Sequence, residues 1–208
     1  MPGAYAGSVS LATSPEGELL VAITIGGSGE QLWTRRRAAS GAWAAPVTAY
    51  LPSPATDLQA PIAAVGPDGR GVVLQETFTQ TGPQSYATQH LLVLEDALGG
   101  GWHTETVSDP VDTTGVGIQT RPALAVGPKG DVAVGWQFAT LDPRGLPATV
   151  RHRLPDGRWL AATSLGQYST EPLLAIDPRG RMRALWSQGA WYVDHVNCCR
   201  ALKSKRLP

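Results

Sequence analysis

The tripeptide Pro-x-Gly recurs in this sequence between short apolar runs. Within residues 121–163 it occurs as Pro128-Lys129-Gly130, Pro143-Arg144-Gly145 and Pro155-Asp156-Gly157. Proline sets φ to about −65°, as the second residue of a type I turn requires, and a helix would break at each proline. The glycine accepts a positive φ, which suits a G1 bulge after such a turn. The runs between, rich in Val and Trp, are therefore predicted to form four strands joined by three tight turns.

Copies of the first of these hairpins recur along the chain. Aligned on Pro-x-Gly, they cover residues 9–25, 61–77, 122–138 and 172–188, and their prolines are 52, 61 and 50 residues apart. A Gly-x-Trp motif follows three of the copies, at Trp43, Trp102 and Trp159. A period of about 50 residues with four strands in each unit is typical of propeller blades.

Composition agrees with a globular all-β chain. The 208 residues include 24 Gly and 17 Pro, which lie between apolar runs, and 16% are charged. Lys+Arg and Asp+Glu number 17 each, so the overall charge favours neither nucleic acid nor a membrane as partner. There is no apolar run of 18 residues and no evident signal peptide, so we expect a soluble protein. The adjacent Cys198 and Cys199 cannot join distant elements, and they leave the compartment open.

The repeats are predicted to form one domain over residues 1–199, with units at about 8–50, 59–111, 121–168 and 171–197. Residues 89–98 fit a helix or a strand by pattern alone, and the repeat favours a strand. The fourth unit has a candidate third strand at 191–196. The last nine residues hold four basic side chains and no acid, so 200–208 are expected to be a basic tail outside the repeat.

The motif Pro-x-Leu-Ala-Val-x-Pro-x-Gly-x-x-x-Val-x-Trp, at 122–136, resembles the repeat of bacterial β-propellers of the sialidase-like, NHL or kelch kind. The resemblance implies an all-β propeller of about four blades, each a four-stranded antiparallel meander, with the last blade incomplete. Sialidase-type propellers carry a Ser-x-Asp-x-Gly-x-x-Trp box, and Asp156-Gly157-Arg158-Trp159 departs from its spacing. The blades could close into a four-bladed ring, or belong to a larger propeller or an assembly.

Tryptophans mark the strands of each repeat. The three that follow Gly-x, Trp43, Trp102 and Trp159, are expected to pack between neighbouring blades, and the alternative is an aromatic platform for a sugar. Trp136 and Trp186 hold equivalent places, eight residues after the turn proline, and are expected in the core.

Four polar residues share one position near the end of the second strand of each repeat. They are Thr24, Glu76, Gln137 and Ser187. In a propeller they would face the axis or its mouth, so we predict that they bind a ligand. The alternative for Glu76 is that it lies at a strand end exposed to solvent. Glu76 is also the candidate acid or base of a glycosidase, which would need Asp112 or Asp142 as its second carboxylate.

Two basic clusters occupy matching third strands, Arg35-Arg36-Arg37 and Arg151-His152-Arg153. They could bind an anion or lie on wet outer strands, and only two of each three can share a face of the sheet. The spacing of the four histidines does not favour a metal site, and no phosphate-loop or nucleophile motif is present. We therefore expect no metal and no cofactor.

The sequence favours a non-catalytic binding or scaffold module that recognises a glycan or a protein through its loop face. The alternatives are a sialidase-like glycoside hydrolase, and a structural piece that associates with itself through exposed blade edges.

Overall fold

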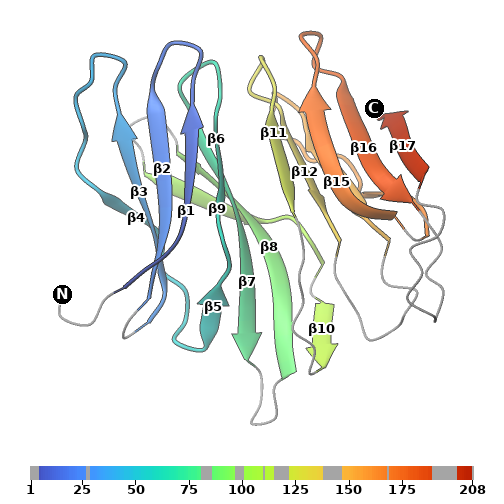
Figure 1. The fold of residues 1–208 in the computed structure, drawn as a ribbon, viewed down its shortest axis with the longest axis horizontal. Helices are drawn as coiled ribbons and strands as arrows, with labels where there is room; N and C mark the ends of the chain where they lie inside the picture. The colour runs from blue at the N-terminus through green and yellow to red at the C-terminus, as the bar shows by residue number, and fades with distance from the viewer. Residues whose placement is uncertain are drawn as a thin grey trace. The chain divides into compact units, whose positions relative to one another are not determined.

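The computed structural model describes residues 5–26, 29–80, 86–96, 101–109, 111–114, 122–137, 147–167, 169–188 and 201–207. Their regular structure is entirely β and forms four antiparallel sheets (Figure 1), which confirms the predicted fold class. In this part of the chain there is no helix of the length and apolarity that crossing a bilayer requires. The chain divides into two compact units, Met1–Gly115 and Val116–Pro208. The expected single domain over residues 1–199 stays a prediction.

The first unit contains sheets 1 and 2. Sheet 1 has the order β1 (Tyr5–Thr13), β2 (Leu19–Gly26), β3 (Gln31–Arg37) and β4 (Val47–Tyr50). Sheet 2 contains the meander β6 (Ile62–Val65), β7 (Gly71–Gln80), β8 (Tyr86–Asp96) and β9 (Trp102–Thr106). Because β7 and β8 extend beyond their neighbours, β5 (Thr56–Leu58) also pairs with β7, and β10 (Val111–Thr114) pairs with β8. Sheet 2 thus has two strands more than the predicted meander. Of the predicted strand at 89–98, residues 89–96 belong to β8, and 97–98 lie outside the described residues.

The second unit contains sheets 3 and 4. Sheet 3 has the order β11 (Ala123–Val126), β12 (Val132–Trp136), β13 (Thr149–Arg153) and β14 (Thr163–Ser164). Sheet 4 has three strands within the described residues: β15 (Ser169–Ile176), β16 (Met182–Gln188) and β17 (Ala201–Arg206).

The hairpin turns have the conformation that Pro-x-Gly predicts. Gly17, Gly69, Gly130 and Gly180 have φ between 77° and 89°. In the second turn the Gly69 N–H donates to the Gly66 carbonyl at 3.0 Å, and the Gly66 N–H donates to the Arg70 carbonyl at 2.8 Å. We call the end of each sheet that carries this turn its turn end. The turn at Pro143-Arg144-Gly145 lies outside the described residues.

The fourth turn contains a carboxylate that the backbone holds ionised. Asp177 accepts hydrogen bonds from the N–H groups of Arg179 at 2.9 Å and Arg181 at 3.1 Å, and from the Arg181 Nε at 2.6 Å. Desolvation raises the pKa of Asp177, but these bonds, from Arg181 above all, outweigh it and hold the pKa below its usual range. This contribution to stability is therefore present above the ordinary aspartate pKa and is lost as the pH falls through the lowered one.

We expect a carboxyl NMR titration to place the midpoint of Asp177 below the ordinary value of about 3.9. In the variant Arg181→Ala the midpoint should move upward, because the guanidinium bond and its charge are gone. A wild-type midpoint at or above the ordinary value would show that the turn does not stabilise the carboxylate.

The expectation for the last nine residues needs correction. Residues 201–206 form β17, which pairs with β16 from Arg183↔Arg206 to Gln188↔Ala201, so they extend sheet 4 instead of forming a tail outside the repeat. All six are exposed, and lysines are common on edge strands because they discourage further pairing. The basic charge of residues 201–206 therefore suggested a tail, although these residues form an edge strand. The candidate third strand at 191–196 lies outside the described residues, and β17 takes the place beside β16.

Each unit has a hydrophobic core between its two sheets. In the first unit Leu20, Ala22 and Leu32 of sheet 1 pack in one cluster with Val73 and Leu94 of sheet 2. In the second unit the cluster joins residues of sheets 3 and 4: Ala133, Ala148, Val150, Leu165, Met182, Ala184, Trp186 and Leu207. Alternate residues of each strand supply these cores, as the pleat of a strand requires.

Candidate functional site

The four predicted ligand-binding residues differ in exposure. Thr24 and Glu76 are buried, at 5% and 4% exposure, whereas Gln137 and Ser187 are half-buried. The Thr24 hydroxyl accepts a hydrogen bond from the Ser8 N–H at 2.9 Å, so it binds the neighbouring strand. Their role as a ligand-binding set stays a prediction.

Glu76, on β7, belongs to a cluster of buried polar side chains with Gln75 of β7 and Gln89 of β8. Its carboxylate accepts a hydrogen bond from the Gln89 side chain, and its backbone carbonyl accepts one from the Gln75 side chain at 2.8 Å. Gln75 and Gln89 are fully buried. Glu76 is therefore no solvated strand end, and its role as a catalytic acid or base stays a prediction. The side chain of Asp112, and Asp142 altogether, lie outside the described residues.

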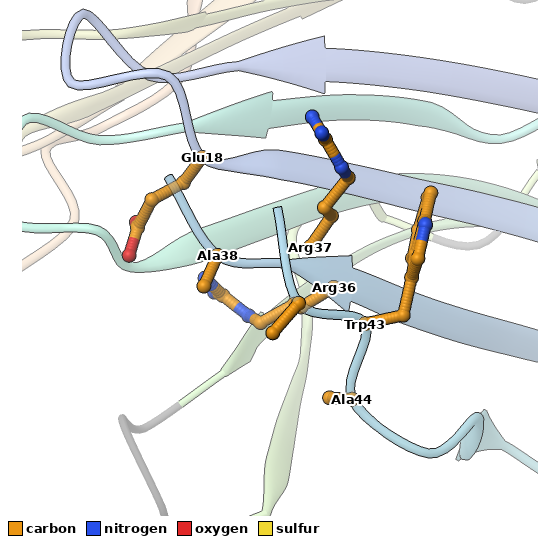
Figure 2. Close-up of a pocket in the computed structure, with 7 residues that line it drawn as sticks. Glu18, Arg36, Arg37, Ala38, Trp43 and Ala44 are labelled. Carbon is orange, nitrogen blue, oxygen red and sulfur yellow. The ribbon is translucent and has the colours of Figure 1, made fainter. Parts of the chain in front are cut away.

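The structure places a pocket at the turn end of sheet 1, where β3 leads toward β4 (Figure 2). Its volume is about 330 Å³. It is lined by charged and aromatic side chains over a floor of small ones, namely Glu18, Arg36, Arg37, Ala38, Ala42, Trp43 and Ala44. The turn that forms the floor is tight: the Gly41 N–H donates to the Ala38 carbonyl at 2.8 Å, and Gly41 has a φ of 93°.

The indole of Trp43 packs against Arg35 of β3. The Arg35 guanidinium lies over the ring, 5.1 Å from its centroid, and its Nε donates to the Ala44 carbonyl at 2.9 Å. Arg37 pairs with Trp43 through an isolated β-bridge. Trp43 nevertheless stays 46% exposed. The result is a fixed, open aromatic surface beside guanidinium groups.

Arg36 points to the other face of sheet 1. Its Nε contacts the Asp96 carboxylate at 2.6 Å, and its Nη1 donates to the Gly69 carbonyl at 2.6 Å, so it joins sheet 1 to the turn end of sheet 2. The three consecutive arginines therefore divide as strand geometry predicts, with Arg35 and Arg37 on one face and Arg36 on the other.

Sheet 3 repeats the same arrangement at the equivalent positions. Arg151 and Arg153 lie 5.5 and 5.7 Å from the ring centroid of Trp159, and the Arg151 Nε donates to the Leu160 carbonyl at 3.0 Å. His152 takes the place of Arg36 and lies 3.3 Å from the Asp131 carboxylate. An arginine lying over the tryptophan of the Gly-x-Trp motif thus recurs in sheets 1 and 3. Sequence analysis did not identify this contact, although the matching Arg and Gly-x-Trp motifs carried the signal.

The expected packing of the tryptophans is confirmed at some positions only. Trp102 packs against the core of the first unit, and Trp136 and Trp186 are buried at 6% and 7% exposure. For Trp43 the expectation was wrong, since nearly half of this side chain is exposed. Among the described residues no three His, Cys, Asp or Glu side chains gather where they could hold a metal ion. Cys198 and Cys199 lie outside those residues.

Solved structures show which class of fold this is. The structure is similar to the Hadza microbial sialidase Hz136, with a TM-score of 0.59 and 15% sequence identity over 98% of this chain and 44% of that one. It is also similar to the β-propeller domain of the Trilobed protease from Pyrococcus furiosus, with a TM-score of 0.50 and 9% identity over 99% of this chain and 57% of that one. The chain therefore has a β-propeller fold, and its four sheets are blades.

These similarities extend to the fold and no further. The chain spans less than half the length of the sialidase that it matches, and at such low identity the activity of that protein does not transfer. No model of a protein family matches the sequence. No curated protein sequence matches it either.

Proposed function

We propose that this chain is a non-catalytic propeller module that binds a glycan bearing an anionic group, at the pocket beside Trp43. The single observation that carries the proposal is the open indole of Trp43, fixed by Arg35 at the edge of a pocket. Trp43 is 46% exposed, whereas the equivalent Trp102 is half-buried against the core of its unit.

The chemistry of the lining supports this class of ligand. The C–H face of a sugar ring can pack on the indole as other apolar groups do. Arg37 lines the pocket and can donate two parallel hydrogen bonds to a carboxylate, sulfate or phosphate. Glu18 can accept hydrogen bonds from sugar hydroxyls. The pocket volume of about 330 Å³ lies at the lower end of the range for ligand sites.

The variant Trp43→Ala should weaken glycan binding by about 2 kcal/mol, which is roughly thirtyfold in Kd, because aromatic contacts of this kind dominate binding energies. The measurement is a screen of acidic and neutral glycans, followed by calorimetric titration of each hit with the wild type and the variant. Arg37→Lys keeps the charge but loses the bidentate geometry, so it should weaken acidic glycans more than neutral ones.

Val47→Ala is the matched control, since Val47 is 49% exposed on β4 and does not line the pocket. It should leave glycan binding unchanged. If Trp43→Ala binds every hit as tightly as the wild type does, the pocket is not the glycan site.

A further inference from the structure

Sheet 1 is apolar on both of its faces, but within the first unit only one face is covered. The inner face contributes Leu20, Ala22 and Leu32 to the core shared with sheet 2. The residues between them point the other way and form the outer face. On it, Val9 is 61% exposed and Leu11 is 62% exposed, which is unusual for branched aliphatic residues in the middle of a strand.

The side chains of the outer face adjoin one another across three strands. Strand register places Val9 opposite Ile23 and Ile23 opposite Trp33, and it places Leu11 opposite Val21. The polar atom of the Trp33 ring is already satisfied, because its Nε1 donates to the Gln31 Oε1 at 2.8 Å. The outer face is therefore a continuous apolar surface, of the kind that marks an interaction site.

In sheets 2 and 4 the face that corresponds to the outer face of sheet 1 packs against the preceding sheet. Val21 lies six residues after its turn proline, and the residues at this position in sheets 2 and 4 are Val73 and Ala184. Val73 packs on sheet 1 with 0% exposure, and Ala184 packs on sheet 3 with 1%. In sheet 1 this position is only half-buried. The repeat thus builds a face for blade packing, and the described residues of the first unit leave it uncovered on sheet 1.

Charge decides which partner suits this face. At the turn end it carries Arg35 and Arg37. The free face of sheet 4, which could pack there in a head-to-tail arrangement, carries the cross-strand pair Arg183 and Arg206 at its own turn end. In the packing that blades use, with turn ends aligned, these four guanidinium groups would meet, and like charges at an interface cost several kcal/mol.

We propose that the outer face of sheet 1 binds the same face of a second copy of this chain, with the strands of the two sheets reversed about a twofold axis. The apolar rows then meet one another, and the two arginine pairs lie at opposite ends of the interface. A twofold contact uses one patch twice and stops at two copies. This inference concerns the strands of the outer face, and it does not depend on the glycan proposal.

Sedimentation velocity of the full chain over a concentration series tests the proposal. The wild type should pass from monomer to dimer and form nothing larger. Leu11→Glu should weaken the dimer at least a hundredfold, because it buries a carboxylate at the centre of the interface. Val9→Lys should do the same, and circular dichroism of both variants shows that they fold.

Leu202→Glu is the matched control, since Leu202 is 73% exposed on β17 of sheet 4. It should leave the dimer intact. Three results would overturn the proposal: a wild type that stays monomeric throughout, growth beyond two copies, or dissociation by Leu202→Glu with no effect of Leu11→Glu. The second and third would instead indicate head-to-tail contact through sheet 4.

Discussion

Replacing Asp131 by alanine should lower the free energy of unfolding by roughly 1–3 kcal/mol, the cost of leaving a buried polar side chain without its hydrogen-bond partner. Asp131 is fully buried and His152 is 2% exposed, and the Asp131 Oδ2 lies 3.3 Å from the His152 Nε2. The other carboxylate oxygen, Oδ1, is buried and makes no hydrogen bond. The imidazole contact is therefore the main compensation for burying this carboxylate, and a cavity beside the histidine adds to the cost of losing it.

The carboxylate of Asp131 is tightly packed against the backbone of its own turn. It fills the space inside the turn of sheet 3, directly against Gly127, where any side chain would collide with it. It also lies 3.8 Å from where a Cβ on Gly180 would stand, in the neighbouring turn of sheet 4. Asp131 thus packs inside the turn of sheet 3 and lies close to the turn of sheet 4, and its loss should loosen the hairpin of sheet 3.

Denaturant titration of the full chain measures the change, and hydrogen exchange of β12 and β13 localises it to the second unit. Asp156→Ala is the control, because Asp156 occupies a turn of the same sheet with 63% of its side chain exposed, and it should change stability by about 0.5 kcal/mol or less. If the two variants lose the same small amount, the buried pair does not stabilise sheet 3.

The local parts of this fold could be predicted from sequence because their causes are local. A proline and a glycine two residues apart determine each hairpin turn, and the observed φ of 77° to 89° at four glycines follows from them. Strand parity likewise separated Arg36 from Arg35 and Arg37. Residues 201–206 were misread because their lysines suggest solvent, although an edge strand tolerates the same residues.

The exposure of a repeated residue could not be predicted, because it depends on what covers it. Trp43 and Trp102 occupy the same position in the repeat, yet Trp102 packs against a core and Trp43 is 46% exposed. The difference lies in the neighbouring blade, which the motif does not encode. The candidate pocket and the outer face of sheet 1 likewise depend on which residues remain uncovered, so neither could be predicted from the sequence.

Replacing Leu20 by alanine should lower the free energy of unfolding by about 2–5 kcal/mol, the range for truncating a fully buried leucine. Leu20 is 0% exposed on the inner face of sheet 1. Its Cδ2 lies 3.0 Å from where a Cβ on Gly71 would stand, so the two blades meet here with no space to spare. Neighbours held by two β-sheets cannot collapse into the cavity, which places the expected cost in the upper half of that range.

Leu11→Ala provides the comparison, since Leu11 belongs to the same sheet and its side chain is 62% exposed on the outer face. At concentrations low enough to keep the chain monomeric it should cost about 0.5 kcal/mol or less, because water already surrounds the leucine. At higher concentration the same variant should lose stability relative to the wild type, because binding that only the folded chain can make stabilises it by mass action. Equal costs for both variants in the dilute chain would mean that the two faces of sheet 1 are equally covered, and the distinction between inner and outer face would then be wrong.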